Sequence, residues 1–401
     1  MQEKKQNEHH ILWIDGIKGI SCLFIVVTHI FLALFPSIYY GPAKESKLFG
    51  IDTYLSSSPF GIIFNGNFFV FLFLFVSGYV ITYQILRIQP EFFGLFHIKR
   101  YLKLTVPLFL YCILFFILSK LSPDYVLSYI SEMKELDNIS LFMTLKQGLY
   151  KILFFGDINY GGQFWMMHYI FLGGLFTSII ATLSWSLGLK NAFIISVFFS
   201  FLLLLNITIH FLAIFLASTY CIFNYMHLKK WSEVKTKYLV FFNCFFTIIL
   251  FISIILGAYP SGYAPKNFYK YLILPVKVNR SSEIYHTIAA TLFFISVSNL
   301  KYMQRFFESK LCLFLAKISY SAFIFHGIIL EYSYPILFHL NIDNYILSSF
   351  IHFFVALSAV IVFAYISTKI IFIPIGKKIN RFFDKKNGTF TFFLKNKQLN
   401  L

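Results

Sequence analysis

The sequence predicts an all-α polytopic membrane protein, a bundle of about ten transmembrane helices with its N- and C-termini in the cytoplasm. Three observations predict this class. Of 401 residues, 58% are hydrophobic and 13% are charged, whereas soluble domains carry charge on about a quarter of their residues. Phenylalanine occurs 54 times, often in runs such as residues 67–76 that leave no polar helix face. The net charge of +17 falls on one side of the predicted membrane.

Ten apolar segments are candidates to cross about 30 Å of hydrocarbon. They are Leu12–Phe35, Gly61–Leu86, Leu104–Ser119, Phe164–Ser184, Ala192–Leu205, Thr208–Phe223, Tyr238–Leu256, Ile284–Leu300, Leu311–Leu330 and Tyr345–Ile373. The first follows a polar stretch with no small-residue cleavage site, so we expect it to be retained as a span. The fifth and sixth share one apolar run around residues 206–210, and charge has to decide whether they are one span or two.

The distribution of charge favours two spans. With the N-terminus inside and ten alternating spans, the inner segments carry the whole net charge of +17 and the outer segments sum to zero. This is the asymmetry of the positive-inside rule. Merging the two spans would place residues 225–237 and the Lys-rich tail outside. We therefore predict a transmembrane domain over residues 1–375 and a basic cytoplasmic tail over residues 376–401.

The same features exclude several functions. The positive net charge suits binding to anionic lipids and cytoplasmic anions. The sequence has no interleaved aromatic and basic residues of the kind that indicate nucleic-acid binding. The longest outer loops, about Leu121–Gln163 and Ala258–Glu283, are too short for an independent catalytic domain, so we expect any chemistry within the membrane. The five cysteines lie in apolar stretches without metal-like spacing, and no metal site is predicted.

The first span carries Asp15, Lys18 and His29, and ionisable groups at membrane depth are functional candidates. Lys18 and His29 are eleven residues apart, which places them about 20° apart on one helix face and about 16 Å apart along the axis. Lys18 would lie near the cytoplasmic entrance and His29 near or beyond the midplane. A snorkelling lysine and a helix-packing histidine are the simpler alternatives.

Further candidates lie on other spans. In the ninth span, Ser319 and His326 are seven residues apart on one face, and His326 has a depth similar to that of His29. The fourth span begins with Trp165 and His168, which also suit an interfacial aromatic belt. In the second span, Ser77 and Gly78 favour close helix approach over chemistry.

A cationic segment joins the second and third spans. Lys99, Arg100 and Lys103 are three cations within five residues, followed by Pro107. At the least, they anchor the inner membrane surface as the positive-inside rule expects. Cations at a helix start also bind phosphate groups.

Four of these segments together resemble the acyltransferase-3 family of integral-membrane O-acyltransferases, which modify cell-surface sugars and related acceptors. Residues 15–19 with His29 look like that family's "DGLRG…H" span, and residues 75–79 are similar to its "FFxxSGfl" span. Residues 99–107 look like its cytoplasmic "RRxxR…P" element, and residues 318–326 are similar to its "ISYSLYLxH" helix. The resemblance covers roughly Leu12–Ile373.

The sequence departs from the family pattern in three places. Lys18 stands at the usual arginine of the first span, which keeps the charge and loses bidentate phosphate recognition. Lys103 likewise stands where the cytoplasmic element of the family has an arginine. The fourth span lacks the glutamate that many relatives carry after the tryptophan, which weakens any acceptor role borrowed for that helix.

The resemblance implies an O-acyltransferase of the plasma (inner) membrane with no bound cofactor. Its donor would be acyl-CoA from the cytoplasm, with acetyl-CoA favoured because acetyl is the family's commonest group. Its acceptor would be a hydroxyl of a cell-surface or lipid-linked saccharide or glycolipid. The resemblance is compatible with either a monomer or an oligomer. The implied site residues are His29, His326 and Ser319 for catalysis, Lys18, Lys99, Arg100 and Lys103 for the donor, and Asp15, Trp165 and His168 for the substrate.

In this interpretation, His29 deprotonates the acceptor hydroxyl or carries the acyl group covalently. His326 and Ser319 orient the acceptor or stabilise the developing oxyanion. A flippase or transporter for lipid-linked saccharides is the leading alternative, and it would line several helices with cations along a continuous path. A membrane glycan polymerase also stays open, because the outer loop around residues 258–283 contains Lys266, Lys270, Lys277 and Arg280. A purely structural scaffold would not need histidines at depth.

Overall fold

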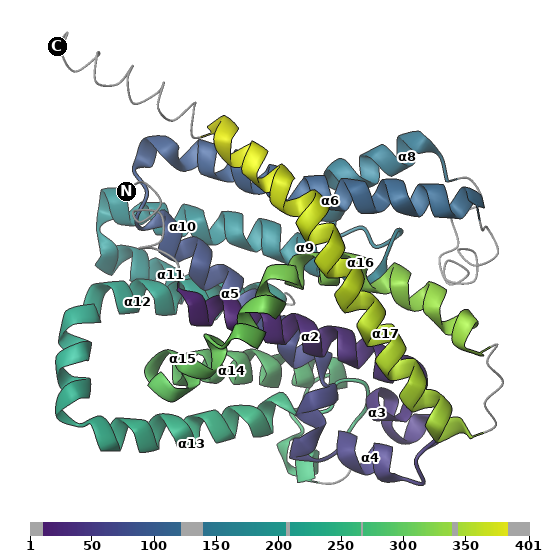
Figure 1. Ribbon diagram of the computed structural model, residues 1–401. Helices are drawn as coiled ribbons and strands as arrows, with labels where there is room; N and C mark the ends of the chain where they lie inside the picture. The colour runs from purple at the N-terminus through teal and green to yellow at the C-terminus, as the bar shows by residue number, and fades with distance from the viewer. Residues whose placement is uncertain (1–10, 122–138, 206–208, 266–267, 339–343, 384–401) are drawn as a thin grey trace.

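The computed structural model describes residues 11–121, 139–205, 209–265, 268–338 and 344–383, and these residues form helices and connecting turns with no strand among them (Figure 1). The polar N-terminus, the end of the basic tail, Lys266 and the junction at residues 206–208 lie outside the described residues. An all-helical architecture is therefore confirmed for the described part of the chain.

Eight helices are long and apolar enough to cross a membrane, and each coincides with a predicted span. These spans are Leu12–Leu34, Gly66–Ile85, Pro90–Leu121, Gly162–Leu187, Ile209–His227, Leu239–Gly257, Lys310–Ser333 and Tyr345–Phe383. Their principal helices are α2 (Leu12–Leu34), α5 (Gly66–Ile85), α6 (Phe93–Leu121), α9 (Trp165–His168) with α10 (Gly174–Leu187), α12 (Ile209–Lys237), α13 (Leu239–Gly257), α16 (Lys310–Phe338) and α17 (Tyr345–Ser367).

The other two predicted spans are also helical, but neither is among the eight. Helix α11 (Leu189–Leu205) has 17 residues and is shorter than a typical span. Helix α14 (Val278–Asn299) has 22 residues, and its first turns carry Arg280, Glu283 and His286, which lower its hydropathy. The total of ten spans and the side on which the termini lie stay predictions.

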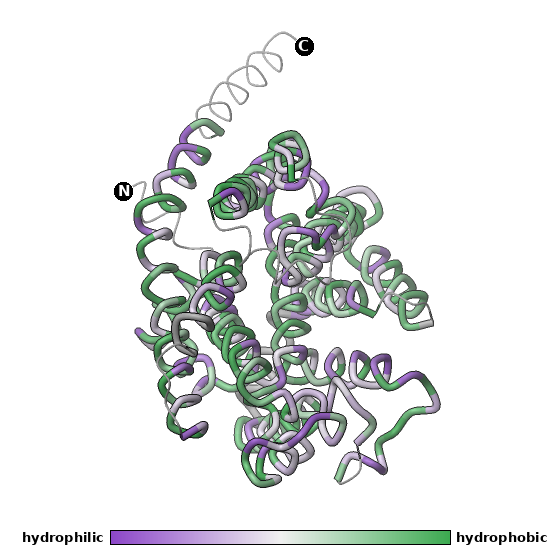
Figure 2. Tube along the Cα trace, turned by 90° about the vertical axis from the view of Figure 1, so that its right-hand side faces the viewer, coloured by the Kyte–Doolittle hydropathy of each residue, from purple (hydrophilic) through white to green (hydrophobic). Residues whose placement is uncertain are grey.

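The centre of the bundle is formed by α2, α5 and α16, with α12 and α14 packed beside α5 (Figure 1). In α5, 78% of the most apolar window is buried, whereas in α13 the share is 17%. The long helices carry hydrophobic residues along most of their length (Figure 2), and large apolar side chains such as Phe241, Ile248 and Phe251 of α13 are exposed. This pattern is expected when lipid, and not water, surrounds the bundle.

Glycines let the central helices approach closely. A Cβ on Gly19 of α2 would lie 2.4 Å from the Ala316 nitrogen of α16, and one on Gly78 of α5 would lie 2.4 Å from the Ile214 carbonyl oxygen of α12. Neither position has room for a side chain. The packing role predicted for Gly78 is confirmed, and Gly19 fixes the first span against α16, the helix that carries His326.

Residues 141–155 form helices where the sequence analysis expected only a loop. Helix α8 (Leu141–Lys146) continues into the π-helical segment η4 (Gln147–Phe155), and both pack against α6. The Tyr101 hydroxyl donates a hydrogen bond to the Leu149 carbonyl oxygen over 2.7 Å. The segment's buried residues are Thr144, Gln147, Gly148, Ile152 and Leu153, and its other apolar side chains are largely exposed.

Candidate functional site

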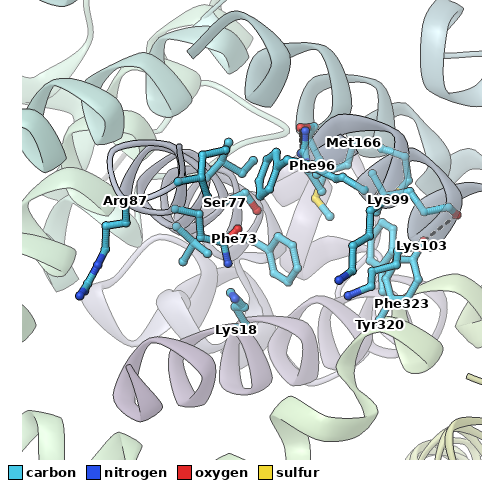
Figure 3. A pocket seen from close by; sticks show the side chains of 18 residues that line it. Lys18, Phe73, Ser77, Arg87, Phe96, Lys99, Lys103, Met166, Tyr320 and Phe323 are labelled. Carbon is cyan, nitrogen blue, oxygen red and sulfur yellow. Dashed lines mark hydrogen bonds between the residues drawn. The ribbon is translucent and has the colours of Figure 1, made fainter. Parts of the chain in front are cut away.

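A cavity of about 590 Å³ lies between α2, α5, α6, α9 and α16, and we call it the basic cavity. Its cationic lining residues are Lys18, Arg87, Lys99, Arg100 and Lys103. Figure 3 shows the amino groups of Lys18, Lys99 and Lys103 directed into the cavity from α2 and α6. The structure thus brings together all four cations that the sequence analysis assigned to the donor, from two helices far apart in the chain.

Arg87 is a lining cation that the sequence analysis did not single out. It follows the C-terminal end of α5, and its guanidinium lies over the Tyr83 ring, 5.1 Å from the ring centroid. Its position close behind an apolar span was the available signal, because such residues lie at a membrane surface. Arg87 marks the far end of the cavity from Lys103 (Figure 3).

Lys18 and Arg100 make polar contacts with protein groups beside the cavity. The Lys18 amino group lies 3.1 Å from the Asp15 carboxylate, three residues earlier on α2. Asp15, predicted to bind substrate, is therefore the ion-pair partner of a donor-site cation. The Arg100 guanidinium donates hydrogen bonds to the carbonyl oxygens of Ile170 at 2.5 Å and Phe171 at 3.3 Å. Both carbonyls belong to the π-helical segment η6 (Tyr169–Gly173), so Arg100 also ties α6 to the fourth span.

A second cavity of about 190 Å³ adjoins the first, and we call it the histidine cavity. Its residues come from α2, α5, α9 and α16 and from nearby turns: Ile25, Thr28, His29, Leu32, Tyr39, Gly66, Asn67, Val70, Gln163, Trp165, Met166 and Phe323. The His29 side chain is exposed to this space, although Thr28 and Ile30 beside it are buried. Within the described part of the chain His29 has no hydrogen-bond partner, and its side chain lines the cavity.

His326 lies directly beside His29. The two ring centroids are 5.1 Å apart, and the rings are inclined by 36°. His326 Nδ1 lies 2.8 Å from the Phe323 carbonyl oxygen and 3.2 Å from that of Ala322. Because carbonyl oxygens only accept hydrogen bonds, Nδ1 carries a proton. In the neutral ring, Nε2 is therefore an acceptor. The structure pairs the two histidines that the sequence placed at similar depth.

Two side chains line both cavities. Met166 of α9 and Phe323 of α16 form part of the basic cavity and part of the histidine cavity. The histidine cavity therefore meets the basic cavity at this pair of residues. His29 is neither sealed in helix packing nor remote from the cations.

Ser319 and His168 lie away from both cavities. The Ser319 hydroxyl donates to the Ala316 carbonyl oxygen at 2.9 Å, and the Ser319 carbonyl accepts a hydrogen bond from the Cys22 thiol at 3.1 Å. Ser319 thus belongs to the packing between α2 and α16. His168 Nδ1 lies 3.2 Å from the Leu153 carbonyl oxygen and holds η4 against the fourth span. Of the two fourth-span candidates, only Trp165 lines the histidine cavity.

Glu283 is linked to Trp165 through His210, although no acidic residue follows Trp165 within the fourth span. The Trp165 ring packs 4.9 Å from the ring of His210, and His210 Nε2 lies 3.9 Å from the Glu283 carboxylate. Glu283 comes from α14 and His210 from the first turn of α12. Sequence reasoning missed both residues, because only the packing of α12 and α14 brings them to the fourth span.

The described residues contain no group of three or more His, Cys, Asp or Glu side chains able to hold a metal ion. The described helices and cavities define a multi-pass membrane protein in which a cationic cavity meets a second cavity beside a pair of histidines.

The chain belongs to the acyltransferase-3 family, since the model of that family's acyltransferase domain matches residues 11–369. The predicted resemblance to this family is thereby confirmed over nearly the whole chain. No curated protein and no solved structure matches the chain. The protein is thus assigned to the membrane acyltransferases.

Proposed function

We propose that the protein is an O-acyltransferase of the plasma membrane. It moves an acyl group, acetyl in the first instance, from acyl-CoA in the cytoplasm to a hydroxyl of a cell-surface or lipid-linked saccharide. One observation carries this proposal: a cavity lined by five cations meets, at Met166 and Phe323, a cavity into which His29 opens. The first suits a polyanionic donor, and the second holds a base for the acceptor.

The donor site is argued from charge and shape. Coenzyme A carries several phosphate groups at one end and a long, thin arm that ends in the thioester. Lysine amino groups bind phosphate as point charges, and arginine binds it through two parallel hydrogen bonds. The rest of the basic cavity is largely apolar, with Phe73, Val80, Ile81 and Leu104 among its lining residues. Such a lining accommodates the arm while the cations hold the phosphates.

The reaction requires one proton transfer and one acyl transfer. Neutral His29 takes the proton of the acceptor hydroxyl while the hydroxyl oxygen attacks the thioester carbonyl carbon. A carbon–oxygen bond forms, the carbon–sulfur bond breaks, and the coenzyme A thiolate leaves. The thiolate then receives the proton from His29, which returns to its neutral form. No further reactant is needed.

The geometry of His326 favours one of the two roles predicted for it. Its Nδ1 proton is directed to the carbonyl oxygens of Ala322 and Phe323, so neutral Nε2 accepts and does not donate. An oxyanion needs a donor, which His326 would supply only when protonated. We therefore assign His326 to orienting His29 or the acceptor hydroxyl. Ser319, which lines neither cavity, supports the α2–α16 contact.

The acceptor site is argued from the polar lining of the histidine cavity. Tyr39, Asn67, Gln163 and Trp165 surround the space in front of His29. Phenol, amide and indole groups hydrogen-bond to hydroxyls, and aromatic faces cover apolar faces of a sugar ring. This cavity is too small for a whole saccharide chain, so the reacting hydroxyl enters it while the rest of the acceptor stays outside.

The two alternatives have less support. Within the described chain, no Lys or Arg lines the histidine cavity, whereas a flippase for charged saccharide carriers would need cations along its whole path. Among the loop cations that favoured a polymerase, Lys270 lies over the Tyr271 ring at 4.7 Å, and neither Lys270 nor Arg280 lines the two cavities.

Mass spectrometry of surface polysaccharide tests the proposed function. Cells lacking the protein are compared with cells complemented by the wild type and by His29→Ala. We expect the wild type alone to restore a mass difference of one acyl group on a saccharide unit. A change in polysaccharide length without loss of acyl groups would instead support a polymerase, and unchanged saccharides in the deletion would contradict the proposal.

A further inference from the structure

The boundary between the two cavities consists of packed side chains. Met166 and Phe323 line both cavities, and they are only 1% and 4% exposed. Figure 3 shows Met166 and Phe323 among the side chains around the basic cavity. Under the proposed function, the thioester arrives through the basic cavity and reacts at His29 in the histidine cavity. The thioester must therefore pass between these two side chains.

We propose that Met166 and Phe323 form an acyl-size filter that admits short groups such as acetyl and excludes longer groups such as octanoyl. This inference rests on the proposed function and adds the donor class. The filter acts sterically, because both residues carry apolar side chains with no proton to give or take. They are therefore specificity-determining residues and not acid–base groups.

The two residues differ in their freedom to move. Phe323 lies on α16, its carbonyl oxygen accepts the hydrogen bond of His326 Nδ1, and the Phe323 and His326 rings are 5.9 Å apart. A shift of its backbone would therefore disturb His326. Met166 has an unbranched, flexible side chain that adopts other rotamers at small cost. We call the gap between the two side chains the slot. Rotation of Met166 opens the slot, and Phe323, whose backbone is held by the hydrogen bond to His326, sets its width.

The space beyond the slot also limits the acyl group. The histidine cavity is about a third of the volume of the basic cavity, 190 Å³ against 590 Å³, and it must hold the acyl carbonyl and the acceptor hydroxyl together. Sites for drug-sized ligands are typically about 300–1,000 Å³. The small cavity between α2, α16 and α17, about 20 Å³, offers no room for an acyl tail. A long chain would stay in the basic cavity and hold its thioester away from His29.

Simple core packing makes a different prediction for the same residues. If Met166 and Phe323 only fill space, shortening either leaves a void and lowers stability without changing the choice of donor. If they form the filter, shortening either widens the slot and lets longer acyl groups reach His29. The ratio of rates with two donors separates these cases, because loss of folded protein lowers both rates equally.

Inverted membrane vesicles from producing cells provide the test, because their cytoplasmic face is open to added donor. Purified acetyl-CoA, butyryl-CoA and octanoyl-CoA are supplied, and release of the coenzyme A thiol is measured after subtracting the rate in His29→Ala vesicles. We expect the wild type to prefer acetyl-CoA over octanoyl-CoA by at least about tenfold. Phe323→Ala and Met166→Ala should each reduce that ratio by about tenfold or more.

Phe325→Ala is the matched control. Phe325 is also 4% exposed and lies two residues further on the same helix, but its ring packs on Tyr111 and Phe363 and lines neither cavity. We expect its donor ratio to equal that of the wild type. Phe323→Leu keeps an apolar side chain of intermediate size, and it replaces Phe323→Ala if the latter does not accumulate.

The outcomes separate the two proposals. His29-dependent release with an unchanged donor ratio in Phe323→Ala, Phe323→Leu and Met166→Ala would overturn the filter and leave the proposed function standing. A wild type that uses octanoyl-CoA as fast as acetyl-CoA would do the same. Absence of His29-dependent release with every thioester would overturn the proposed function itself.

Discussion

The imidazole rings of His29 and His326 lie 5.1 Å apart, centroid to centroid, although 297 positions separate the two residues in sequence. His326 is fixed by its Nδ1 hydrogen bonds to its own helix, and His29 faces the histidine cavity. The His326 ring therefore limits the orientations that the neighbouring His29 ring can adopt. We expect this pair to act as one unit in the acyl transfer.

Removing the fixed ring should slow the reaction without weakening donor binding. We predict that His326→Ala lowers kcat by about a hundredfold, because a misplaced base loses about that factor. The KM for acetyl-CoA should stay near the wild-type value, since His326 lies outside the basic cavity. Steady-state kinetics in membrane vesicles checks this split. A raised KM with unchanged kcat would place His326 in donor binding instead.

Lys18 should act through donor affinity. We predict that Lys18→Ala raises the KM for acetyl-CoA by about tenfold, the loss of one charge-assisted contact, whereas Lys18→Arg keeps the wild-type KM. The matched control is Lys310→Ala, since Lys310 is exposed at the start of α16 and lines neither cavity. An unchanged KM in Lys18→Ala would remove Lys18 from the donor site.

Gly19 should be essential for packing. Its added Cβ would lie 2.4 Å from the Ala316 nitrogen and 2.7 Å from the Cys312 carbonyl oxygen, both backbone atoms that cannot turn aside. We predict that Gly19→Ala lowers the free energy of unfolding by about 1–3 kcal/mol, the usual cost of overpacking. Thermal unfolding in detergent measures this effect. Gly94→Ala, with no atom within 4 Å of the added Cβ, should leave stability nearly unchanged.

Asp52 should make stability depend on pH. Burial raises the pKa of this carboxyl, but hydrogen bonds from the hydroxyls of Ser37 and Ser46 and from the amides of Lys47 and Thr53 outweigh burial and lower it. A lowered folded-state pKa adds stability above the unfolded pKa of about 3.9, and this stability is lost as the pH falls through the folded value.

We therefore predict that Asp52→Asn lowers the melting temperature at pH 7, and that the difference from the wild type shrinks below about pH 4. The control is Glu45→Gln, because the Glu45 side chain is 84% exposed and should show no such difference. Melting curves of both variants across pH provide the check. A difference between Asp52→Asn and wild type that is constant from pH 7 to pH 3 would contradict the assignment.

Much of the fold and part of the site were predictable from local pattern. Apolar runs identify the helices because lipid demands apolar side chains along a whole span. The shared face of Lys18 and His29 follows from helix geometry, and the structure places both on cavities that meet. Lys99 and Lys103 line the same cavity as Lys18. Predicting this depended on the family resemblance, because helix periodicity carries no information about contacts between helices.

The remainder depends on how helices cross. Ser319 and His326 share a face of α16. At Ser319, α2 packs directly against α16. The two helices leave a cavity only closer to His326, at Phe323. His168 was expected beside Trp165, yet a segment not predicted to be helical supplies the Leu153 carbonyl that engages it. Glu283 reaches His210, and thereby the surroundings of Trp165, only through packing of α14 against α12.

The most direct measurement follows radiolabelled acetyl groups from acetyl-CoA into the saccharide fraction of inverted membrane vesicles. We predict transfer with the wild type and background transfer with His29→Ala at equal protein level, because no other described group in the histidine cavity is a comparable base. His29→Ala vesicles that label saccharide as fast as the wild type would contradict the account.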